Sequence, residues 1–262
     1  MESPPGYEQF CDDLWTLLST YPPPFIYIQD IESTQTAFSI VQELLQSLSN
    51  TALSTKVHYA RVDAISCFTP RLIFETIIHS LVGWESRWED GCAIWNPGHG
   101  IRERRGDENE GETNVRVELR WNENLDTFLH GLRSAHAHLS KQTLSKSRKD
   151  KGKRKGKGKE GLQAECDNVR FVIVVERPER LKEVHPELMV PFTRLAELVR
   201  FIFYRTRGKT DFFGQARIDL SVVFISQVGW EDIRPPLAAS PDPFYIDVQS
   251  PSKEGRFSYP SA

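Results

Sequence analysis

Phe25-Ile26-Tyr27-Ile28-Gln29-Asp30-Ile31-Glu32-Ser33-Thr34-Gln35-Thr36 is the stretch of sequence that decides the fold. Its first four residues are apolar or aromatic, which predicts a buried strand, and the polar residues after them predict a tight loop. Apolar residues then recur at helical spacing from Ala37 to Leu48, which predicts a helix that covers a sheet. The stretch therefore predicts the strand, loop and helix with which an α/β domain begins.

The same stretch has the layout of a P-loop, G-x-x-x-x-G-K-[ST], with most of its defining residues replaced. In that motif the glycines let backbone N–H groups wrap phosphates, the lysine supplies a positive charge and the hydroxyl reaches Mg²⁺. Gln29 and Thr34 stand at the glycine positions and Gln35 at the lysine position, so that only Thr36 fits. From this motif alone, an ordinary strand-loop-helix remains an alternative. We interpret it as a vestigial nucleotide site formed by Gln29, Asp30, Ser33, Thr34, Gln35 and Thr36.

The composition indicates an intracellular globular protein without a metal site. The chain has 262 residues, of which 39% are hydrophobic, so it can bury a full core. Its longest strongly apolar run, 171–175, is far shorter than the roughly 20 residues of a membrane-spanning helix, and the N-terminus lacks the pattern of a secretory signal. The four cysteines are widely separated, and His130, His136 and His138 do not have metal-ligand spacing. We expect reduced cysteines that pack in the core, and no bound metal.

The charge is divided between an acidic body and one basic segment. Residues 146–159 contain nine Lys or Arg and one Asp, a net charge of +8; since the whole chain carries −3, the rest carries −11. Glycine alternates with lysine there, which predicts a disordered, solvated loop. Alternatively, the segment contacts DNA phosphates or directs nuclear import. The residues that would do so are Lys146, Arg148, Lys149, Lys151, Lys153, Arg154, Lys155, Lys157 and Lys159.

Strand and helix patterns alternate along the chain and predict an α/β fold with a five-stranded, mainly parallel sheet. The predicted strands are 25–28, 57–62, 169–175, 218–225 and 244–248, and the predicted helices are 7–20, 37–48, 70–81, 125–132 and 186–204. Polar segments interrupt the pattern. We interpret them as a surface insertion at about 84–122, a disordered basic loop at about 141–165, a polar insertion at 205–217 and an irregular tail at 249–262.

Three segments carry a resemblance to a known family. They are Phe25 to Leu45, Val62-Asp63-Ala64-Ile65-Ser66-Cys67-Phe68-Thr69-Pro70-Arg71-Leu72, and Phe224-Ile225-Ser226-Gln227-Val228-Gly229-Trp230-Glu231-Asp232-Ile233-Arg234-Pro235. In these segments the chain resembles the subunit 5 family of the eukaryotic origin recognition complex. The resemblance implies a three-layer α-β-α P-loop NTPase fold of the AAA+ type, with residues 1–248 as the ATPase-like base domain. We expect the lid and winged-helix regions of that family to be absent from these 262 residues.

The resemblance also assigns residues beyond the loop. Glu176 stands where AAA+ proteins place an Asp that organises Mg²⁺, and Ser226 stands where they place a polar sensor. Arg177 occupies the position at which active ATPases carry the Glu that positions water. A chain without the lysine and without this Glu lacks the main phosphate partner and the base for hydrolysis. We therefore expect no catalytic residues and no cofactor, neither ATP nor Mg²⁺.

The resemblance implies a function in the initiation of DNA replication. The chain would be a nuclear, structural subunit that contacts the other origin recognition complex subunits and double-stranded DNA within the complex, and helps to load the helicase. One alternative is an active AAA+ ATPase whose phosphate cradle is rebuilt from residues such as Ser33 and Thr34. The other is a protein that binds DNA through its basic segment.

Overall fold

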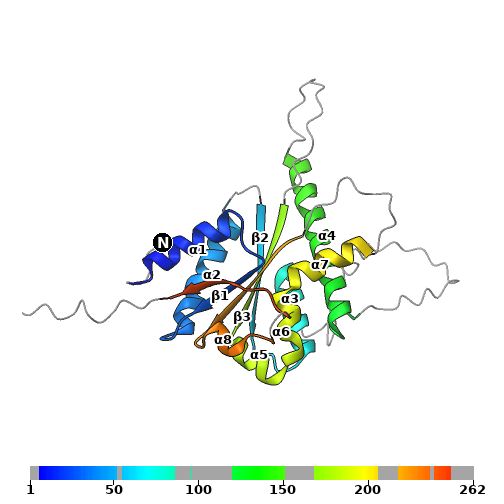
Figure 1. Ribbon diagram of the computed structural model, residues 1–262. Helices are drawn as coiled ribbons and strands as arrows, with labels where there is room; N and C mark the ends of the chain where they lie inside the picture. The colour runs from blue at the N-terminus through cyan, green and yellow to red at the C-terminus, as the bar shows by residue number, and fades with distance from the viewer. Residues whose placement is uncertain are drawn as a thin grey trace, which may run out of the picture.

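A five-stranded sheet, in which every pair of neighbouring strands is parallel, lies at the centre of the molecule (Figure 1). The computed structural model describes residues 6–51, 55–85, 95, 120–150, 168–205, 218–236 and 239–248. The strand order is β2-β3-β4-β1-β5. The strands are β1 (Phe25–Gln29), β2 (Thr55–Asp63), β3 (Asn168–Glu176), β4 (Asp219–Ser226) and β5 (Phe244–Asp247). This confirms the predicted α/β sheet, and the sheet is parallel throughout.

Helices cover both faces of the sheet, so that the molecule has three layers (Figure 1). Side chains alternate across a strand, and β1 therefore sends Ile26 and Ile28 to one face and Phe25 and Tyr27 to the other. The first face packs against α1 (Glu8–Ser19) and α2 (Thr34–Asn50). The second packs against α3 (Pro70–Val82), α4 (Leu125–Asp150), α6 (Pro186–Thr193) and α7 (Leu195–Arg205).

The segment after β3 contains more helices than the sequence pattern predicts. Instead of one helix over 186–204, the chain forms α6 and α7 with a break at Arg194. Pro191 inside α6 has no N–H to donate, and Thr193 Oγ1 donates to the Val190 carbonyl at 2.9 Å. Both features disfavour one continuous helix through Arg194. Two short helices, α5 (Pro178–Val184) and α8 (Trp230–Ile233), were not predicted.

The predicted surface insertion at 84–122 is wrong in part, since Glu85 and Arg120 are exposed but other described residues of it are buried. Trp95 and Trp121 belong to the main hydrophobic core, with 5% and 8% of their surface exposed, and Asn122 is also buried. A Cβ at Gly131 of α4 would lie 2.5 Å from Ile78 of α3 and 2.9 Å from Trp121, so the glycine allows these residues to approach α4 closely. Residues 86–94 and 96–119 of this insertion lie outside the described residues, as do the polar insertion at 206–217 and the tail at 249–262.

The predicted disordered loop is wrong at its beginning, because α4 continues to Asp150. Leu125–Leu139 packs one face of α4 on the core, and a helix that is already nucleated extends easily through Lys, Arg and Gln, which are good helix formers. Lys146, Arg148 and Lys149 therefore lie on a helix that projects from the body in Figure 1. The remaining six basic residues, Lys151 to Lys159, lie outside the described residues.

No helix in the described part of the chain is long and apolar enough to cross a membrane. Cys11 and Cys67 are buried free thiols, as predicted, and burial raises the pKa of both. Cys92 and Cys166 lie outside the described residues.

Candidate functional site

The loop between β1 and α2 lies at the carboxyl edge of the sheet, where parallel α/β proteins place their ligand sites. Ser226 at the end of β4 is adjacent, because the Asp30 N–H donates to the Ser226 carbonyl at 2.9 Å. Glu176 ends β3 and is paired in register with Ile225 of β4. The structure therefore brings the predicted site residues of all three strands to one edge.

The loop is filled by its own carboxylate. Asp30 is 1% exposed, and its Oδ1 accepts hydrogen bonds from the backbone N–H groups of Glu32 at 3.0 Å and Ser33 at 2.9 Å. In a P-loop, successive N–H groups of this kind point at a phosphate. Here an anion supplied by the chain takes the place that a phosphate would need.

Tyr7 closes the loop from the other side. Its hydroxyl donates to Asp30 Oδ2 at 3.3 Å, although the two residues are 23 positions apart in sequence. Burial raises the pKa of Tyr7, and the negative charge of Asp30 raises it further, so the hydroxyl remains a proton donor. Tyr7 belongs to the segment that leads into α1, and nothing in the loop motif pointed to it.

The hydroxyl groups of the loop cap α2. Ser33 is the N-cap residue, and its Oγ accepts from the Thr36 N–H at 3.2 Å and from Thr36 Oγ1 at 2.9 Å. Thr36 is the one residue that fits the P-loop motif, and here its hydroxyl donates to the N-cap residue of α2. Thr34 is the first residue of α2, and Gln35 follows it with an exposed side chain.

Gln29 joins three strands instead of shaping a phosphate cradle. Its side-chain oxygen accepts from the Tyr245 hydroxyl of β5, and its amide nitrogen donates to the Gln227 carbonyl at 3.4 Å. Its backbone carbonyl accepts from the Val248 N–H at 2.9 Å. The residue at the first glycine position is therefore fixed by contacts of its own side chain.

Two ion pairs cross between the ends of β2 and β3. Both Glu176 oxygens contact the Arg61 guanidinium, with an Nη2–Oε2 distance of 3.2 Å, and Glu176 is 5% exposed. Arg61 also lies over the Phe38 ring, 4.0 Å from its centroid. In the second pair, Arg177 Nη2 lies 2.6 Å from Asp63 Oδ1. The carboxylate at the expected Mg²⁺ position thus already has a cation beside it.

The backbone of Arg177 adopts an unusual conformation. Its φ is 55° and its ψ is 53°, the left-handed region, and it is the only non-glycine residue with positive φ in the described ranges. That conformation costs a residue with a Cβ about 1 kcal/mol or more. Burial alone raises the pKa of Asp63, but hydrogen bonds from Ser66 and Ile65 and the charge of Arg177 outweigh it and lower the pKa. The ion pair holds Arg177 in place.

Ser226 is also engaged within the chain. It is fully buried, and its hydroxyl donates to Glu179 Oε2 at 2.6 Å and accepts from the Val228 N–H at 3.2 Å. Sequence reasoning missed Tyr7, Arg61, Asp63 and Glu179. Only Asp63 carried a signal, since it is an acidic residue at the end of a predicted strand. Among the described residues, no group of three or more His, Cys, Asp or Glu side chains is arranged to hold a metal ion.

The comparisons with known proteins concern the fold. No family model matches the chain, and no curated protein matches it in sequence. A structure of the Drosophila origin recognition complex bound to DNA matches with a TM-score of 0.52 and 17% identity, over 93% of this chain and 43% of that chain. The ORC1 protein of Aeropyrum pernix in complex with DNA matches with a TM-score of 0.47 and 13% identity, over 94% of this chain and 46% of that chain.

The chain thus spans less than half the length of these similar proteins. Its five parallel strands in the order β2-β3-β4-β1-β5, between two layers of helices, form the AAA+ type of α/β fold, which confirms the predicted fold class.

Proposed function

We propose that the chain is a structural AAA+ module of the origin recognition complex, of the subunit 5 type, which acts in replication initiation by assembly and not by ATP hydrolysis. One observation carries the proposal. The carboxylate of Asp30 accepts the two backbone N–H groups of the loop in which a working module would bind phosphate.

Electrostatics argues against nucleotide binding in this loop. Two unit charges of the same sign about 4 Å apart repel by about 4 kcal/mol at an effective dielectric constant of 20. Such a penalty lowers an affinity by about 10³-fold. Gln35 contributes no positive charge to offset it. A nucleotide would have to displace Asp30 and leave its carboxylate without its hydrogen bonds.

The carboxyl end of β3 argues against magnesium. A cation held by Glu176 would have to replace Arg61 or share the carboxylate with it, and the two positive charges would repel each other. Arg177 stands where a hydrolytic Glu is expected, and it is held by Asp63. The carboxylate at the magnesium position is thus committed to an ion pair, and the position of the hydrolytic Glu holds an arginine that is itself paired.

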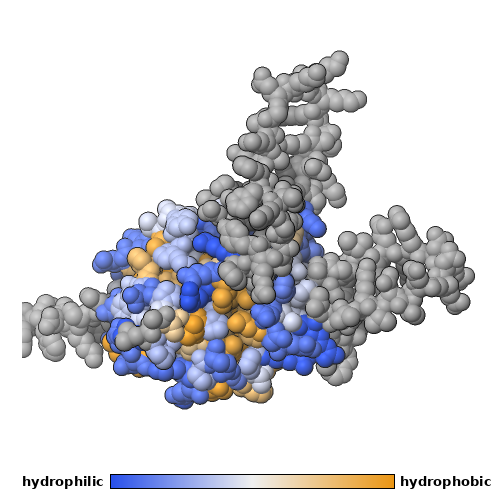
Figure 2. Space-filling model, turned by 45° about the vertical axis from the view of Figure 1, so that its right-hand side comes forward, coloured by the Kyte–Doolittle hydropathy of each residue, from blue (hydrophilic) through white to orange (hydrophobic). Residues whose placement is uncertain are grey.

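Exposed apolar side chains near the same edge fit a role in assembly. Ile65 and Phe68, in the loop between β2 and α3, are 50% and 65% exposed, and Val184 at the end of α5 is 53% exposed. This loop and the end of α5 are in contact, because His185 Nε2 lies 3.0 Å from the Phe68 carbonyl oxygen. Figure 2 shows hydrophobic residues reaching the surface among hydrophilic ones on one face. Apolar groups that gather on a surface commonly mark contacts with other proteins.

Calorimetric titration of the chain with ATP and Mg²⁺ tests the loss of nucleotide binding. We expect no heat of binding up to millimolar ATP, and submicromolar affinity would favour the alternative, an active ATPase with an atypical loop. The double variant Asp30→Gly with Gln35→Lys removes the internal anion and adds the missing charge. It should bind ATP more tightly than the wild type, whereas Gln35→Lys alone should not.

Co-purification tests the assembly. The tagged chain, expressed in a eukaryotic nucleus, should recover other origin recognition complex subunits together with double-stranded DNA. Recovery of none of them would overturn the proposal. Because assembly does not depend on ATP in this proposal, Gln35→Lys, which changes an exposed side chain and keeps Asp30, should leave this recovery unchanged.

The end of α4 supports a second candidate function, DNA contact or nuclear import by the basic segment. Lys146, Arg148 and Lys149 lie on one continuous helix beyond the part that packs on the core. Cations on such a helix can neutralise phosphates without reading sequence, and each phosphate contact adds about 0.9 to the slope of log K against log salt. Neutralising these three residues should reduce the slope by up to about 3. An unchanged slope would exclude DNA contact by these three residues.

A further inference from the structure

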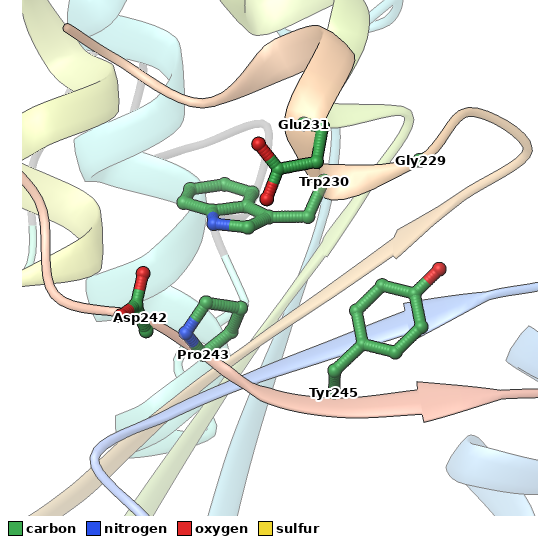
Figure 3. Close-up of a pocket in the computed structure, with 6 residues that line it drawn as sticks. All are labelled: Gly229, Trp230, Glu231, Asp242, Pro243 and Tyr245. Atoms are coloured by element: carbon green, nitrogen blue, oxygen red, sulfur yellow. The ribbon is translucent and has the colours of Figure 1, made fainter. Parts of the chain in front are cut away.

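A pocket of about 380 Å³ lies between α8 and the segment that leads into β5 (Figure 3). It contains none of the residues of the P-loop-like stretch, and the proposed function makes no use of it. The volume lies at the lower end of the 300–1,000 Å³ typical of ligand pockets, which suits a single large side chain. The residues that line it are Gly229, Trp230, Glu231, Asp242, Pro243 and Tyr245.

Two aromatic rings of the pocket are held in place by the core. Trp230 is 6% exposed, and its ring packs against Phe25 at 5.2 Å and Tyr27 at 5.4 Å. Tyr245 stacks on the same Tyr27 ring, at 5.7 Å and an interplanar angle of 13°. Tyr245 remains 44% exposed. Since both rings are fixed by a shared neighbour, a ligand that packs against them need not order them first.

The pocket is acidic. Glu231 and Asp242 both line it, with the Glu231 carboxylate over the Trp230 indole and Asp242 next to Pro243 (Figure 3), and none of the described residues that line it is basic. Arg234 contacts both Glu231 oxygens, with Nε 3.1 Å from Oε2 and Nη1 donating to Oε1 at 3.4 Å. The Glu231 side chain is 74% exposed, so each oxygen can accept a further hydrogen bond from solvent or from a second partner. Anionic ligands such as nucleotides are therefore repelled, and a cation is attracted both by the carboxylates and by the ring faces.

An open strand edge lies next to the pocket. Among the described residues, β5 is the last strand on its side of the sheet and pairs only with β1. Phe244 and Tyr245 expose 48% and 44% of their surface on this strand. The unpaired backbone groups of an edge strand can take up an extended segment of another protein, whose alternate side chains then enter pockets beside the strand.

We propose that this pocket binds the guanidinium group of an arginine in an extended segment of a partner protein. Guanidinium is planar, so it stacks on an aromatic face, and its fork of N–H groups pairs with carboxylates. An ammonium group offers neither the plane nor the fork. The pocket therefore prefers arginine to lysine, and the strand edge of β5 binds the backbone on either side of it.

Nuclear magnetic resonance titration of the full chain tests the proposal. The probe is a capped seven-residue peptide of serine, threonine and valine with one central arginine, and the signal is the Trp230 indole N–H, assigned with Trp230→Phe. We expect saturable shifts with the arginine peptide, at least threefold weaker binding of the lysine peptide and no binding of the glutamine peptide. Equal binding of all three peptides, or none of the arginine peptide, would overturn the proposal.

Two variants locate the site without disturbing the core. Asp242→Asn and Glu231→Gln each remove one charge from an exposed side chain and keep its size. Each should lower the affinity for the arginine peptide by about 3- to 10-fold. The control Glu187→Gln removes an equally exposed acid, 61% accessible, on α6 outside the pocket. It should leave the affinity unchanged. If the pocket variants bind like this control, the arginine lies elsewhere and the assignment is wrong.

Discussion

Replacement of Asp30 is predicted to destabilise the fold, because its carboxylate organises the loop between β1 and α2. Oδ1 accepts two backbone N–H groups, at 3.0 and 2.9 Å, and Oδ2 accepts the Tyr7 hydroxyl at 3.3 Å. Asp30→Ala removes all three bonds and leaves three donors without this acceptor. Asp30→Asn keeps an acceptor for the backbone groups but removes the charge.

The magnitude follows from these contacts. A hydrogen bond to a charged group contributes about 1.5–3 kcal/mol, and a donor left buried without a partner costs about 1–3 kcal/mol. The loop is only partly buried, so water can satisfy some of the freed donors. We expect Asp30→Ala to lower the free energy of unfolding by about 2–4 kcal/mol and Asp30→Asn by about 1–2 kcal/mol. For a chain of this size the larger change lowers the Tm by roughly 4–16 °C.

Urea denaturation followed by circular dichroism measures both variants against the wild type. Glu32→Gln is the matched control, since it removes one negative charge from an exposed position in the same loop, and we expect a change within about 0.5 kcal/mol. An Asp30→Ala variant as stable as this control would refute the reasoning. In that case the carboxylate would not organise the loop, and the argument against phosphate binding would lose its basis.

Three further predictions concern the rest of the fold. Gly131→Ala should destabilise the protein by about 1–3 kcal/mol in thermal unfolding despite its better helix propensity, because the new Cβ would lie 2.5 Å from Ile78 and 2.9 Å from Trp121; a more stable variant would contradict this packing. Ser33→Ala removes the cap of α2 and should lower the free energy of unfolding by about 1 kcal/mol in urea denaturation. A urea midpoint equal to that of the wild type would contradict this prediction. Burial lowers the pKa of His58 from 6.5 to about 4. Between these pH values the unfolded chain binds a proton at His58 and the folded chain does not, so stability should fall as the pH drops from about 6.5 towards 4. His58→Gln should reduce that loss by up to about 2 kcal/mol between pH 7 and 5, and identical pH profiles of unfolding would show that His58 is not responsible.

Most of the sheet could be predicted from the sequence because its central strands β3, β4 and β1 are mostly apolar and buried on both faces. The continuous run in β3 and the apolar stripe of α2 leave few other interpretations. The breaks in the pattern were harder to interpret. Trp95 and Trp121 stand among polar residues, yet they fill the core beside α3 and α4, and a pattern of neighbours in sequence cannot show that.

The candidate site could be located from the sequence, but its internal contacts could not. Gln29 to Thr36, Glu176 and Ser226 were placed by the P-loop layout and by the resemblance, and the structure brings them to one edge of the sheet. The partners come from distant positions. Tyr7 reaches Asp30 across 23 residues, and Arg61 reaches Glu176 across 115 residues, through strand pairing that only the fold defines.

The carboxylate in the loop also bears on how such a site could change over time. A lysine introduced at position 35 would stand in the first turn of α2, the helix that follows the loop of Asp30, so that its charge would offset the negative charge of Asp30. Removal of Asp30 alone would free the N–H groups but cost stability and provide no cation. By this reasoning no single substitution makes the loop a phosphate site, and at least these two changes are needed together.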